Sequence, residues 1–249
     1  MNILKKDTLQ NFSDWYEPIL EKGGVALINK EFNWTSFDVI AKLRKILKIK
    51  KIGHGGTLDP LATGLLIVCV GRPATRLADY YQDFPKEYHC KIQLGAITPT
   101  YDLESIPQDF KDYSHIIDEQ IYEVLNSFVG NIEQVPPLHS AVKVNGKRAY
   151  ELARNKTDFQ LESRPITIYS IDNISINLPQ IEFSVLCSKG TYIRTLANDI
   201  GQKLGCGAYL SGLVRTKISE FHIDDAISVD EIRTKATIYN ETNNINIVQ

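Results

Sequence analysis

Hydrophobic and polar positions along the chain follow two periods, one near 3.6 residues and one of 2, which separate expected helices from expected strands. The segment 35–49 places its aliphatic residues on one helical face and its basic residues on the other. Thr35 and Asp38 have the spacing of a capping box at its start. By these criteria we expect helices over 35–49, 118–130, 148–155 and 191–205, and strands over 25–29, 65–70, 86–95 and 181–190.

Details of this pattern indicate the fold class. Residues 65–70 are apolar throughout, which predicts a strand buried on both faces, whereas 86–95 alternates strictly and predicts a strand with one face in the core. Gly130 is the expected C-cap of the helix before it, and Asn145–Gly146 the expected tight turn. Because strands and helices are mixed without regular strand–helix–strand alternation, we expect an α+β fold around a large mixed, mostly antiparallel sheet flanked by helices.

The chain has 249 residues, enough for one domain with a substantial core, which we expect over 23–231. Residues 1–22 lack the apolar core and cleavage site of a signal peptide and are interpreted as an N-terminal extension. Residues 232–249 are interpreted as a short polar C-terminal tail. No apolar stretch approaches the roughly 18 residues of a membrane span, so we expect a cytoplasmic protein without membrane contact.

The cysteines and histidines show no functional spacing. Cys69, Cys90, Cys187 and Cys206 form no C-x-x-C pair, and the 5 histidines form no metal-binding motif. In a reducing compartment, cysteines in apolar surroundings are typically buried free thiols. We therefore expect no disulfide and no metal site.

Charge is distributed unevenly, although the net charge is only −2. Lys42–Lys51 holds six basic residues in ten and no acid, and Lys143–Lys156 holds five basic residues against one acid. Two local basic segments on a nearly neutral chain suit a polyanion that is bound locally. Solvated helix faces are the alternative, and the composition alone does not decide between the two.

A single aspartate, Asp59, lies between the glycine-rich segment 53–56 and the apolar strand 65–70. A charge beside a buried segment costs free energy unless it has a partner or a chemical task. Arg194 falls in the first turn of the expected helix 191–205, where the helix dipole disfavours a cation by roughly 0.3–1 kcal/mol. A carboxylate would offset that cost, and Asp59 is the candidate; a solvent-directed arginine is the alternative.

An aspartate paired with an arginine stays ionised, so it is a poor proton donor but acts as a nucleophile or stabilises a developing positive charge. The chain has no pair of catalytic carboxylates, no P-loop and no G-x-S-x-G motif. Tyr88 and Tyr192 are candidates to stack on a planar ligand such as a nucleobase. The residues thus indicate covalent or electrostatic catalysis by Asp59. A hydrolase using Asp59 and His54 is weaker, because no oriented nucleophile accompanies them.

The segment around Asp59, GHGGTLDPLATGLL, resembles the catalytic motif of the bacterial tRNA pseudouridine-55 synthases, the TruB family. Further blocks in the order of that family extend the resemblance over roughly residues 23–231. These blocks read VALINKEFNWTSFDV, KEY, GAITPTYD, PPLHSAVKVNGKRAYELAR, KGTYIRTLANDIG and GAYLSGLVRT. Chance similarity is a poor explanation for so many ordered blocks at compatible spacing.

The resemblance implies a cofactor-free isomerase that flips the uridine at position 55 out of the tRNA T-loop, detaches it from C1′ and rejoins it through C5. It implies that Asp59 is the essential catalytic aspartate, attacking either the base or the sugar, and that Arg194 pairs with it. Tyr88 is then expected to stack on the flipped base and to assist removal of the C5 proton. The substrate contacts implied in the same way are Tyr192 and Leu213 lining the pocket, His54 filling the gap left by the base, and Lys30 as the substrate-side lysine.

The chain departs from the family pattern at Glu31, Gly55 and Val214, where proline, threonine and arginine are usual. Glu31 puts the role of Lys30 in doubt, and Val214 removes one RNA contact. Many members of the family end in a PUA domain, a module that binds RNA. The residues after 231 leave no room for a C-terminal PUA domain, so RNA recognition is expected to rest on the catalytic core.

We therefore expect a monomeric enzyme that binds the T-arm stem-loop of tRNA, largely through phosphate contacts of Lys and Arg, without a protein partner. One alternative is a non-catalytic RNA-binding or tRNA-folding module, against which the presence of Asp59, Tyr88 and Arg194 argues. The other is a pseudouridine synthase acting on another RNA. Guide-RNA-dependent relatives are of this kind, but they carry the PUA domain that is missing here.

Overall fold

The computed structural model describes residues 2–140, 142–144, 146–154 and 159–243. The chain forms two compact units. The first unit comprises Met1–Lys86 and Val214–Gln249, and the second unit comprises Glu87–Leu213. The segment expected to form one domain, 23–231, thus contributes to both units.

Two long antiparallel strands, β2 (Gly24–Lys30) and β4 (Thr63–Val70), form the centre of the first unit. The short strand β1 (Asn2–Leu4) pairs parallel to β2, and β3 (Ile52–His54) pairs antiparallel to β4. Val214 and Arg215 of β11 (Ala208–Ile218) pair parallel to the start of β4, and the last residues of β11 pair antiparallel to β12 (Phe221–His222). The expected strands over 25–29 and 65–70 are confirmed.

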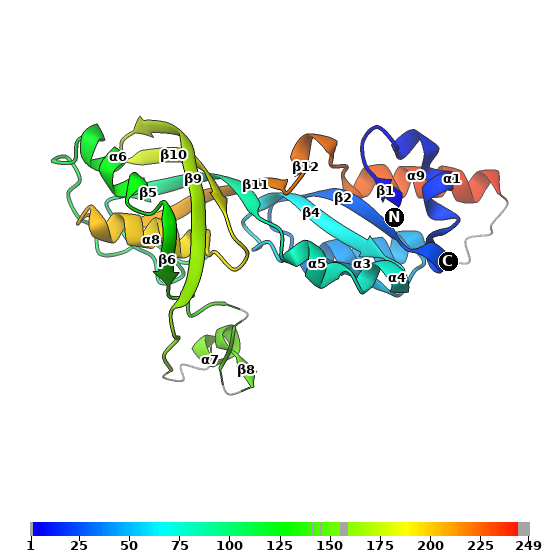
Figure 1. Cartoon of the computed structure of the whole chain (residues 1–249), viewed down its shortest axis with the longest axis horizontal. Coiled ribbons are helices and arrows are strands. Elements are labelled where there is room, and N and C mark those ends of the chain that lie inside the picture. Colours follow the sequence, from blue (N-terminus) through cyan, green and yellow to red (C-terminus); the bar gives the residue numbers. More distant parts are fainter. Residues whose placement is uncertain (1, 141, 145, 155–158, 244–249) are drawn as a thin grey trace. The chain divides into compact units, whose positions relative to one another are not determined.

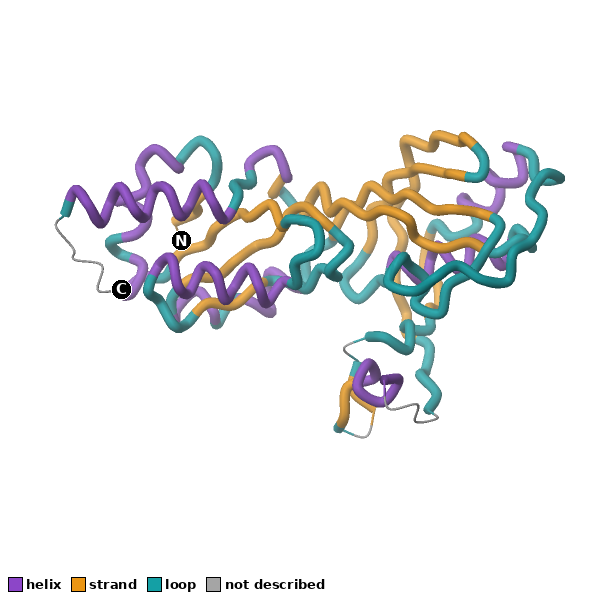
Figure 2. The backbone as a smooth tube through the Cα atoms, turned by 180° about the vertical axis from the view of Figure 1, so that it is seen from behind, coloured by secondary structure: helices purple, strands orange, loops and turns teal. Residues whose placement is uncertain are grey.

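Both faces of this sheet are buried, which explains the uninterrupted apolar run of β4. One hydrophobic cluster contains Leu66, Val68 and Val70, and the other contains Leu65, Ile67 and Cys69. The first cluster is covered by α1 (Phe12–Tyr16), α3 (Ser36–Leu47) and α9 (Val229–Thr242). The second is covered by α4 (Arg72–Thr75) and α5 (Ala78–Gln82). Figure 2 shows the two long helices of this unit, α3 and α9, lying along its strands.

The segments 2–22 and 229–242, near the two ends of the chain, contribute to the core of the first unit. Residues 2–22, expected as an extension, form β1, a 3-10 turn (Leu9–Asn11), α1 and α2 (Ile19–Lys22), and they bury Phe12 and Trp15. Residues 229–242 form α9 and bury Ile232, whereas the sequence predicted a polar tail from 232. The reason is that the apolar positions of α9 are few but lie on one face, which packs against α3 and α1.

The strands of the second unit follow the order β11, β5, β10, β9 and β6 (Figure 1). Their bounds are Lys86–Leu94 for β5, Gly130–Gln134 for β6, Arg164–Asn177 for β9 and Gln180–Cys187 for β10. Strands β9 and β10 are antiparallel, as are β6 and β9. The alternation expected for β5 is confirmed, because every second residue from Tyr88 to Leu94 is buried.

The main helices of the second unit are α6 (Asp118–Asn126) and α8 (Ile193–Lys203). The prediction that Gly130 caps the first of them is wrong. Ser127 is the C-cap, a further turn buries Phe128, and Gly130 adopts a φ of 114° at the start of β6. The glycine is needed for the turn into the strand and not for the end of the helix.

A small separate element lies between β6 and β9. It contains β7 (Lys143–Val144), β8 (Lys147–Arg148) and α7 (Ala149–Arg154), so the helix expected there is confirmed. Asn145, the first residue of the expected tight turn, lies outside the described residues, as does part of the second basic segment.

The architecture is α+β, with a mixed, mostly antiparallel sheet flanked by helices, as expected. All four cysteines are free and buried, which confirms that prediction. Within the described ranges, no helix has the length and apolar character needed to cross a lipid bilayer.

Candidate active site

Asp59 lies in the loop between β3 and β4 of the first unit, and side chains from elsewhere in this unit fix the backbone around it. The preceding residue, Leu58, donates its N–H to Ser36 Oγ (2.8 Å) and accepts the Ser36 hydroxyl at its carbonyl (3.1 Å). Asp59 itself accepts a hydrogen bond from the Ala62 N–H (3.1 Å) at its carbonyl oxygen. The start of α3 therefore holds the loop directly before the aspartate.

Arg215 holds the glycine-rich side of this loop, a role that was not predicted from the sequence. Its side chain is 1% exposed and donates from Nη2 to Gly56 O (3.2 Å) and from Nη1 to Thr57 O (3.4 Å). Its Nε–H donates to Leu65 O (2.7 Å). Gly64, with a φ of 105°, allows β11 to approach, because a Cβ there would lie 2.4 Å from the carbonyl oxygen of Arg215.

Lys30 holds the other side of the loop. Its ammonium donates to the carbonyl oxygens of Trp34 (2.6 Å), Glu31 (3.0 Å) and Pro60 (3.3 Å). Burial lowers the pKa of Lys30 from 10.5 to about 8; the negative charge of Asp59 raises it, and the charge of Arg215 lowers it further. Lys30 thus lies close enough to Asp59 for their charges to interact. The hydrogen bonds of its ammonium group go to backbone carbonyl oxygens.

His54 ends β3, in the same unit as Asp59. Burial, and to a smaller extent the charge of Arg215, lowers the pKa of its imidazole from the usual 6.5. Its Nδ1 is buried and has no hydrogen-bond partner within the part of the chain that the structure describes. The ring is therefore neutral at neutral pH, which suits contact with a nucleobase better than contact with a phosphate.

The departure from the family pattern at Gly55 has a structural reason. A Cβ at this position would lie 2.5 Å from Cβ of Tyr81, a residue of α5 that packs against the loop. The threonine usual in the family would therefore require α5 to shift in this chain. Val214, the third departure, pairs with Thr63 in the parallel ladder between β11 and β4.

Arg194 is buried in the second unit, in the first turn of α8 as expected, so a solvent-directed arginine is excluded. Its Nε lies 3.6 Å from Oδ2 of Asp102, whose side chain is also buried. Nη1 donates to Thr100 O (3.4 Å) and Nη2 to His139 O (3.3 Å). Asp102, from the block GAITPTYD, is therefore a counter-ion of Arg194. This role was not identified from the sequence, because the only indication was that Asp102 is an acidic residue within that block.

Tyr192 is fixed by its backbone at the N-cap of α8. The buried side-chain amide of Gln134 accepts from the Tyr192 N–H (2.8 Å) and donates to its carbonyl oxygen (3.1 Å). Gln134, at the end of β6, is a second residue that the sequence did not indicate. Leu213, the other expected pocket residue of this unit, is partly exposed in β11.

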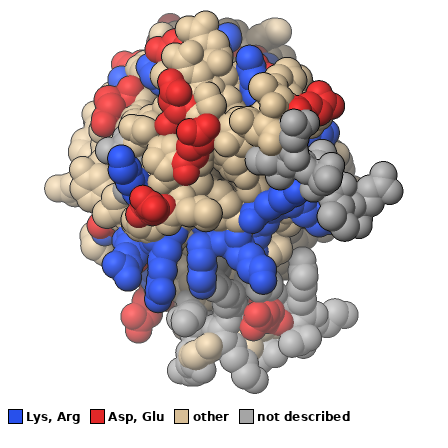
Figure 3. Space-filling view, turned by 90° about the vertical axis from the view of Figure 1, so that its right-hand side faces the viewer, with Lys and Arg blue, Asp and Glu red and all other residues tan. Residues whose placement is uncertain are grey.

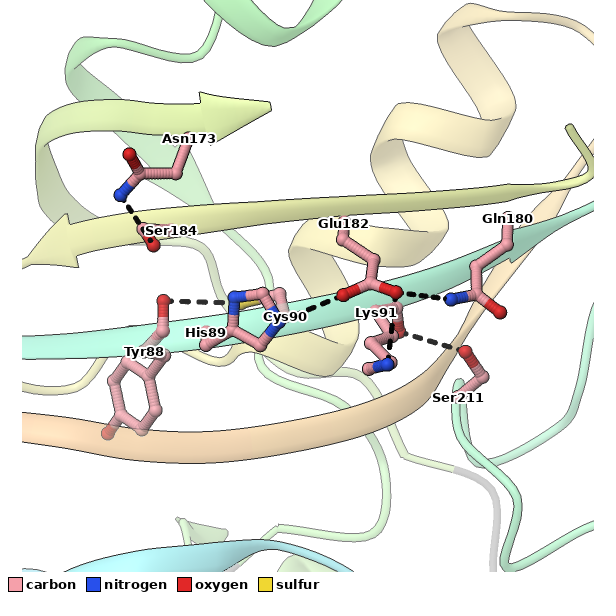
Figure 4. A network of polar contacts seen from close by, with 9 residues as sticks. All are labelled: Tyr88, His89, Cys90, Lys91, Asn173, Gln180, Glu182, Ser184 and Ser211. Carbon is pink, nitrogen blue, oxygen red and sulfur yellow. Dashed lines mark hydrogen bonds and ion pairs between the residues drawn. The ribbon is translucent and has the colours of Figure 1, made fainter. Parts of the chain in front are cut away.

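Tyr88 lies on the buried face of β5 and is 8% exposed. The opposite face carries a polar network around Glu182, and the Tyr88 ring points away from it (Figure 4). Glu182 accepts hydrogen bonds from Lys91 (3.0 Å) and Gln180 (2.6 Å) and pairs with His89 (3.0 Å). The hydrogen bond from Lys91 is the main reason that the pKa of Glu182 is lowered. β5 thus separates a charged outer surface from the candidate stacking residue.

The predicted site residues fall into two groups. Asp59, His54 and Lys30 belong to the first unit, where the structure brings them together with Arg215. The second group, in the second unit, consists of Tyr88, Tyr192, Arg194 and Leu213. The pairing of Asp59 with Arg194 joins residues of different units and stays a prediction.

Comparison with known proteins assigns the class of this fold. A family model described as "TruB family pseudouridylate synthase (N terminal domain)" matches residues 44–193. Another, described as "tRNA pseudouridylate synthase B C-terminal domain", matches residues 194–247. The fold is thus that of a pseudouridylate synthase. Within that class, the chain belongs to the TruB family.

Individual relatives agree with this assignment. The chain is 47% identical over 209 residues to the "tRNA pseudouridine synthase B" of Clostridium tetani, covering 84% of this chain and 72% of that protein. It is 49% identical over 216 residues to the protein of the same name from Parabacteroides distasonis, covering 84% and 92%. A solved chain from a Cbf5-Nop10-Gar1 complex is 31% identical with a TM-score of 0.67, covering 89% of this chain and 61% of its own length.

Proposed function

We propose that this chain isomerises the uridine at position 55 in the T-arm of tRNA to pseudouridine, as a cytoplasmic tRNA-modifying enzyme. The observation that carries the proposal is the immobilised loop of Asp59, whose neighbours Gly56, Leu58 and Pro60 are each held by a side chain of the first unit. A loop held in place before substrate binds removes much of the entropy cost of positioning the carboxylate that it carries. Relatives with this fold carry the name tRNA pseudouridine synthase B.

The reaction needs no external reactant. The C1′–N1 bond of the uridine breaks, the base turns, and a C1′–C5 bond forms. The hydrogen on C5 leaves as a proton and N1 gains a proton, so the product is an isomer of the substrate. Asp59 acts as an ionised nucleophile on the base or the sugar, and both routes fit a carboxylate held next to basic groups.

The other site residues have supporting roles in this proposal. Arg194, oriented by Asp102, neutralises Asp59 in the complex with RNA. Tyr88 stacks on the flipped base and assists removal of the C5 proton, and Tyr192 and Leu213 line its pocket. His54, as a neutral ring, fills the gap that the base leaves. Lys30 acts on the substrate side by positioning the loop, because its ammonium already donates to three backbone carbonyls.

The proposed enzyme works as a monomer on the T-arm stem-loop, without a protein partner. A base in a loop is already loosened, so flipping it costs less than flipping one from a duplex. Phosphate contacts by Lys and Arg provide much of the affinity, which therefore weakens as salt concentration rises.

The test is release of tritium from a tRNA transcript carrying [5-³H]uridine, since formation of the C1′–C5 bond expels that hydrogen. We expect release of about one tritium per tRNA, abolished by Asp59→Asn and by replacing the uridine at position 55 with cytidine. Asp79→Asn, at an exposed position of the same unit, is the matched control and should keep full activity. Tight tRNA binding without any release would leave a non-catalytic RNA-binding module.

A further inference from the structure

The first unit carries a surface cluster of cations that the proposed reaction does not use. Between Asp38 and Asp79 the chain contains eight Lys or Arg residues and a single acid, Asp59. Two of the eight cations have partners inside the unit. Lys42 lies 4.1 Å above the centroid of the Trp34 ring, and Arg44 donates to Ile52 O (3.0 Å).

The six remaining cations are all exposed, and we call them the basic strip. They are Lys45, Lys48, Lys50, Lys51, Arg72 and Arg76. The strip begins in the last turn of α3 and follows the chain toward β3. It includes α4 because the Gly71 N–H donates to Lys51 O (2.8 Å), which brings Arg72 next to Lys51. Figure 3 shows Lys and Arg side chains gathered in a band on this face, with most of the acids away from it.

No acid of the described residues neutralises the basic strip. Among the residues that the structure describes, no ion pair involves any of its six side chains. Adjacent like charges repel one another, so such a cluster costs stability unless an anion is bound. The negative end of the α3 dipole accounts for Lys45 and Lys48. It does not account for Lys50, Lys51 and Arg72, which lie beyond that helix.

The distance from the strip to Asp59 follows from α3. The N-terminal residue of this helix, Ser36, is hydrogen-bonded to Leu58, the neighbour of Asp59. The helix has 12 residues and therefore a length of about 18 Å. Lys48 is the C-cap at the other end of this helix, so this part of the basic strip lies too far from Asp59 to touch the phosphates of a nucleotide bound there.

We propose that the basic strip binds the phosphate backbone of the tRNA about 15–20 Å from the target uridine. It is a second contact that holds the body of the substrate while Asp59 acts on the base. This inference rests on the proposed function. Because RNA is a polyanion with regularly spaced charges, a row of exposed lysine and arginine side chains fits it without base-specific contacts.

The test compares Lys51→Gln/Arg72→Gln with a control of equal charge change, Lys6→Gln/Lys235→Gln, which lies in the same unit outside the strip. For the strip variant we expect Kd for full-length tRNA to rise about tenfold at ~0.1 M salt, with the slope of log Kd against log salt falling by about 0.7–0.9 per lost phosphate contact. The single-turnover rate at saturating tRNA should be unchanged in both variants. Equal effects in the two variants, or none in the strip variant, would overturn the proposal.

A second measurement fixes the position of the contact. The four native cysteines are buried, so Lys50→Cys offers a selective site for a tethered iron chelate that cleaves nearby RNA. Cleavage of bound tRNA outside the T-loop supports the proposal, and cleavage confined to the T-loop contradicts it. These binding measurements do not depend on tritium release, so failure of the strip and failure of the proposed reaction are distinguishable. Unchanged tRNA affinity with lost binding to anionic vesicles would assign the strip to a lipid surface instead.

Discussion

At the scale of single residues, two buried cations hold the backbone on both sides of Asp59. Arg215 donates to the carbonyls of Gly56 and Thr57 before the aspartate, and Lys30 donates to the carbonyl of Pro60 after it. Burying a cation costs free energy that hydrogen bonds to carbonyl dipoles offset only in part. Apolar residues would stabilise the fold at lower cost, so the position of the loop is the better explanation for both cations.

Replacing Arg215 by lysine should slow the reaction more than it weakens binding. Lysine keeps the charge but cannot donate to three carbonyls from one planar group. The loop then loses part of its fixed position, and a displacement near 1 Å can cost about 100-fold in rate. We expect single-turnover tritium release to fall roughly 10- to 100-fold, with the Kd for tRNA nearly unchanged. Arg233→Lys, at an exposed position paired with Asp230, is the control and should leave both values as they are.

The lowered pKa of Lys30 predicts that the reaction rate declines at alkaline pH. Its pKa is lowered to about 8, so in the folded protein it loses its proton near this pH, whereas in the unfolded chain it does so near 10.5. Between these values the unfolded chain binds more protons, and the contribution of Lys30 to the unfolding free energy therefore rises with pH. Activity should change in the opposite direction, because a neutral amine has two donors for three carbonyls and no charge beside Asp59.

The measurement is the pH dependence of the single-turnover rate. The rate of the unmodified protein should decline above pH about 8 without loss of folded protein. Lys30→Met should be slower at pH 7 and should lack this decline. If the rate of the variant declines in the same pH range, another group is responsible for the decline, and Lys30 does not position the loop through its charge.

At the scale of elements, the N-terminus of α3 is hydrogen-bonded to the loop of Asp59 through Ser36 and Leu58. Ser36→Ala removes both hydrogen bonds to Leu58. Because the loop is then less well positioned, we expect the single-turnover rate to fall by about tenfold. Thr35→Ala removes the capping box of the same helix, which costs about 1 kcal/mol of stability, but leaves Leu58 bound. A larger loss of rate in Thr35→Ala than in Ser36→Ala would show that helix stability, and not the tie to Leu58, sets the rate.

The elements themselves were largely predictable from the sequence, because their signals are local. The capping box at Thr35 and the alternation of β5 each lie within one short segment, and the structure confirms both. The bond from Arg215 to Gly56 spans 159 positions and leaves no periodic trace, so Arg215 was missed. Gly130 shows the limit of a local signal, since a glycine after a helical segment marks either its cap or the following turn.

At the scale of the whole molecule, the first unit is built from two segments that are far apart in the sequence. The second unit is inserted between Lys86 and Val214, and α9 then returns to cover the same hydrophobic cluster as α1 and α3. This return was missed because the end of the chain is rich in polar residues. What decides burial is that Val229, Ile232 and Ala236 share one helical face.

Measuring how much α9 contributes to stability tests whether it packs as a helix in the core or behaves as a polar tail. Ile232 is 0% exposed in the core, whereas Ile238 of the same helix is 51% exposed. We expect Ile232→Ala to lower the unfolding free energy by about 2–5 kcal/mol, from lost burial and the cavity left behind. Ile238→Ala should change it by less than about 0.5 kcal/mol. Helix propensity changes equally in the two variants, so their difference reports packing alone.

Tryptophan fluorescence is the suitable probe for denaturant unfolding of these variants. The chain has 2 tryptophans, and both Trp15 and Trp34 belong to the first unit. Trp15 is buried and donates to Val25 O (3.0 Å), so its emission changes when this core opens. A shifted midpoint for Ile232→Ala alone would establish that α9 completes the hydrophobic core of the first unit. Identical midpoints for the two variants would mean that the first unit holds Asp59 in place without α9.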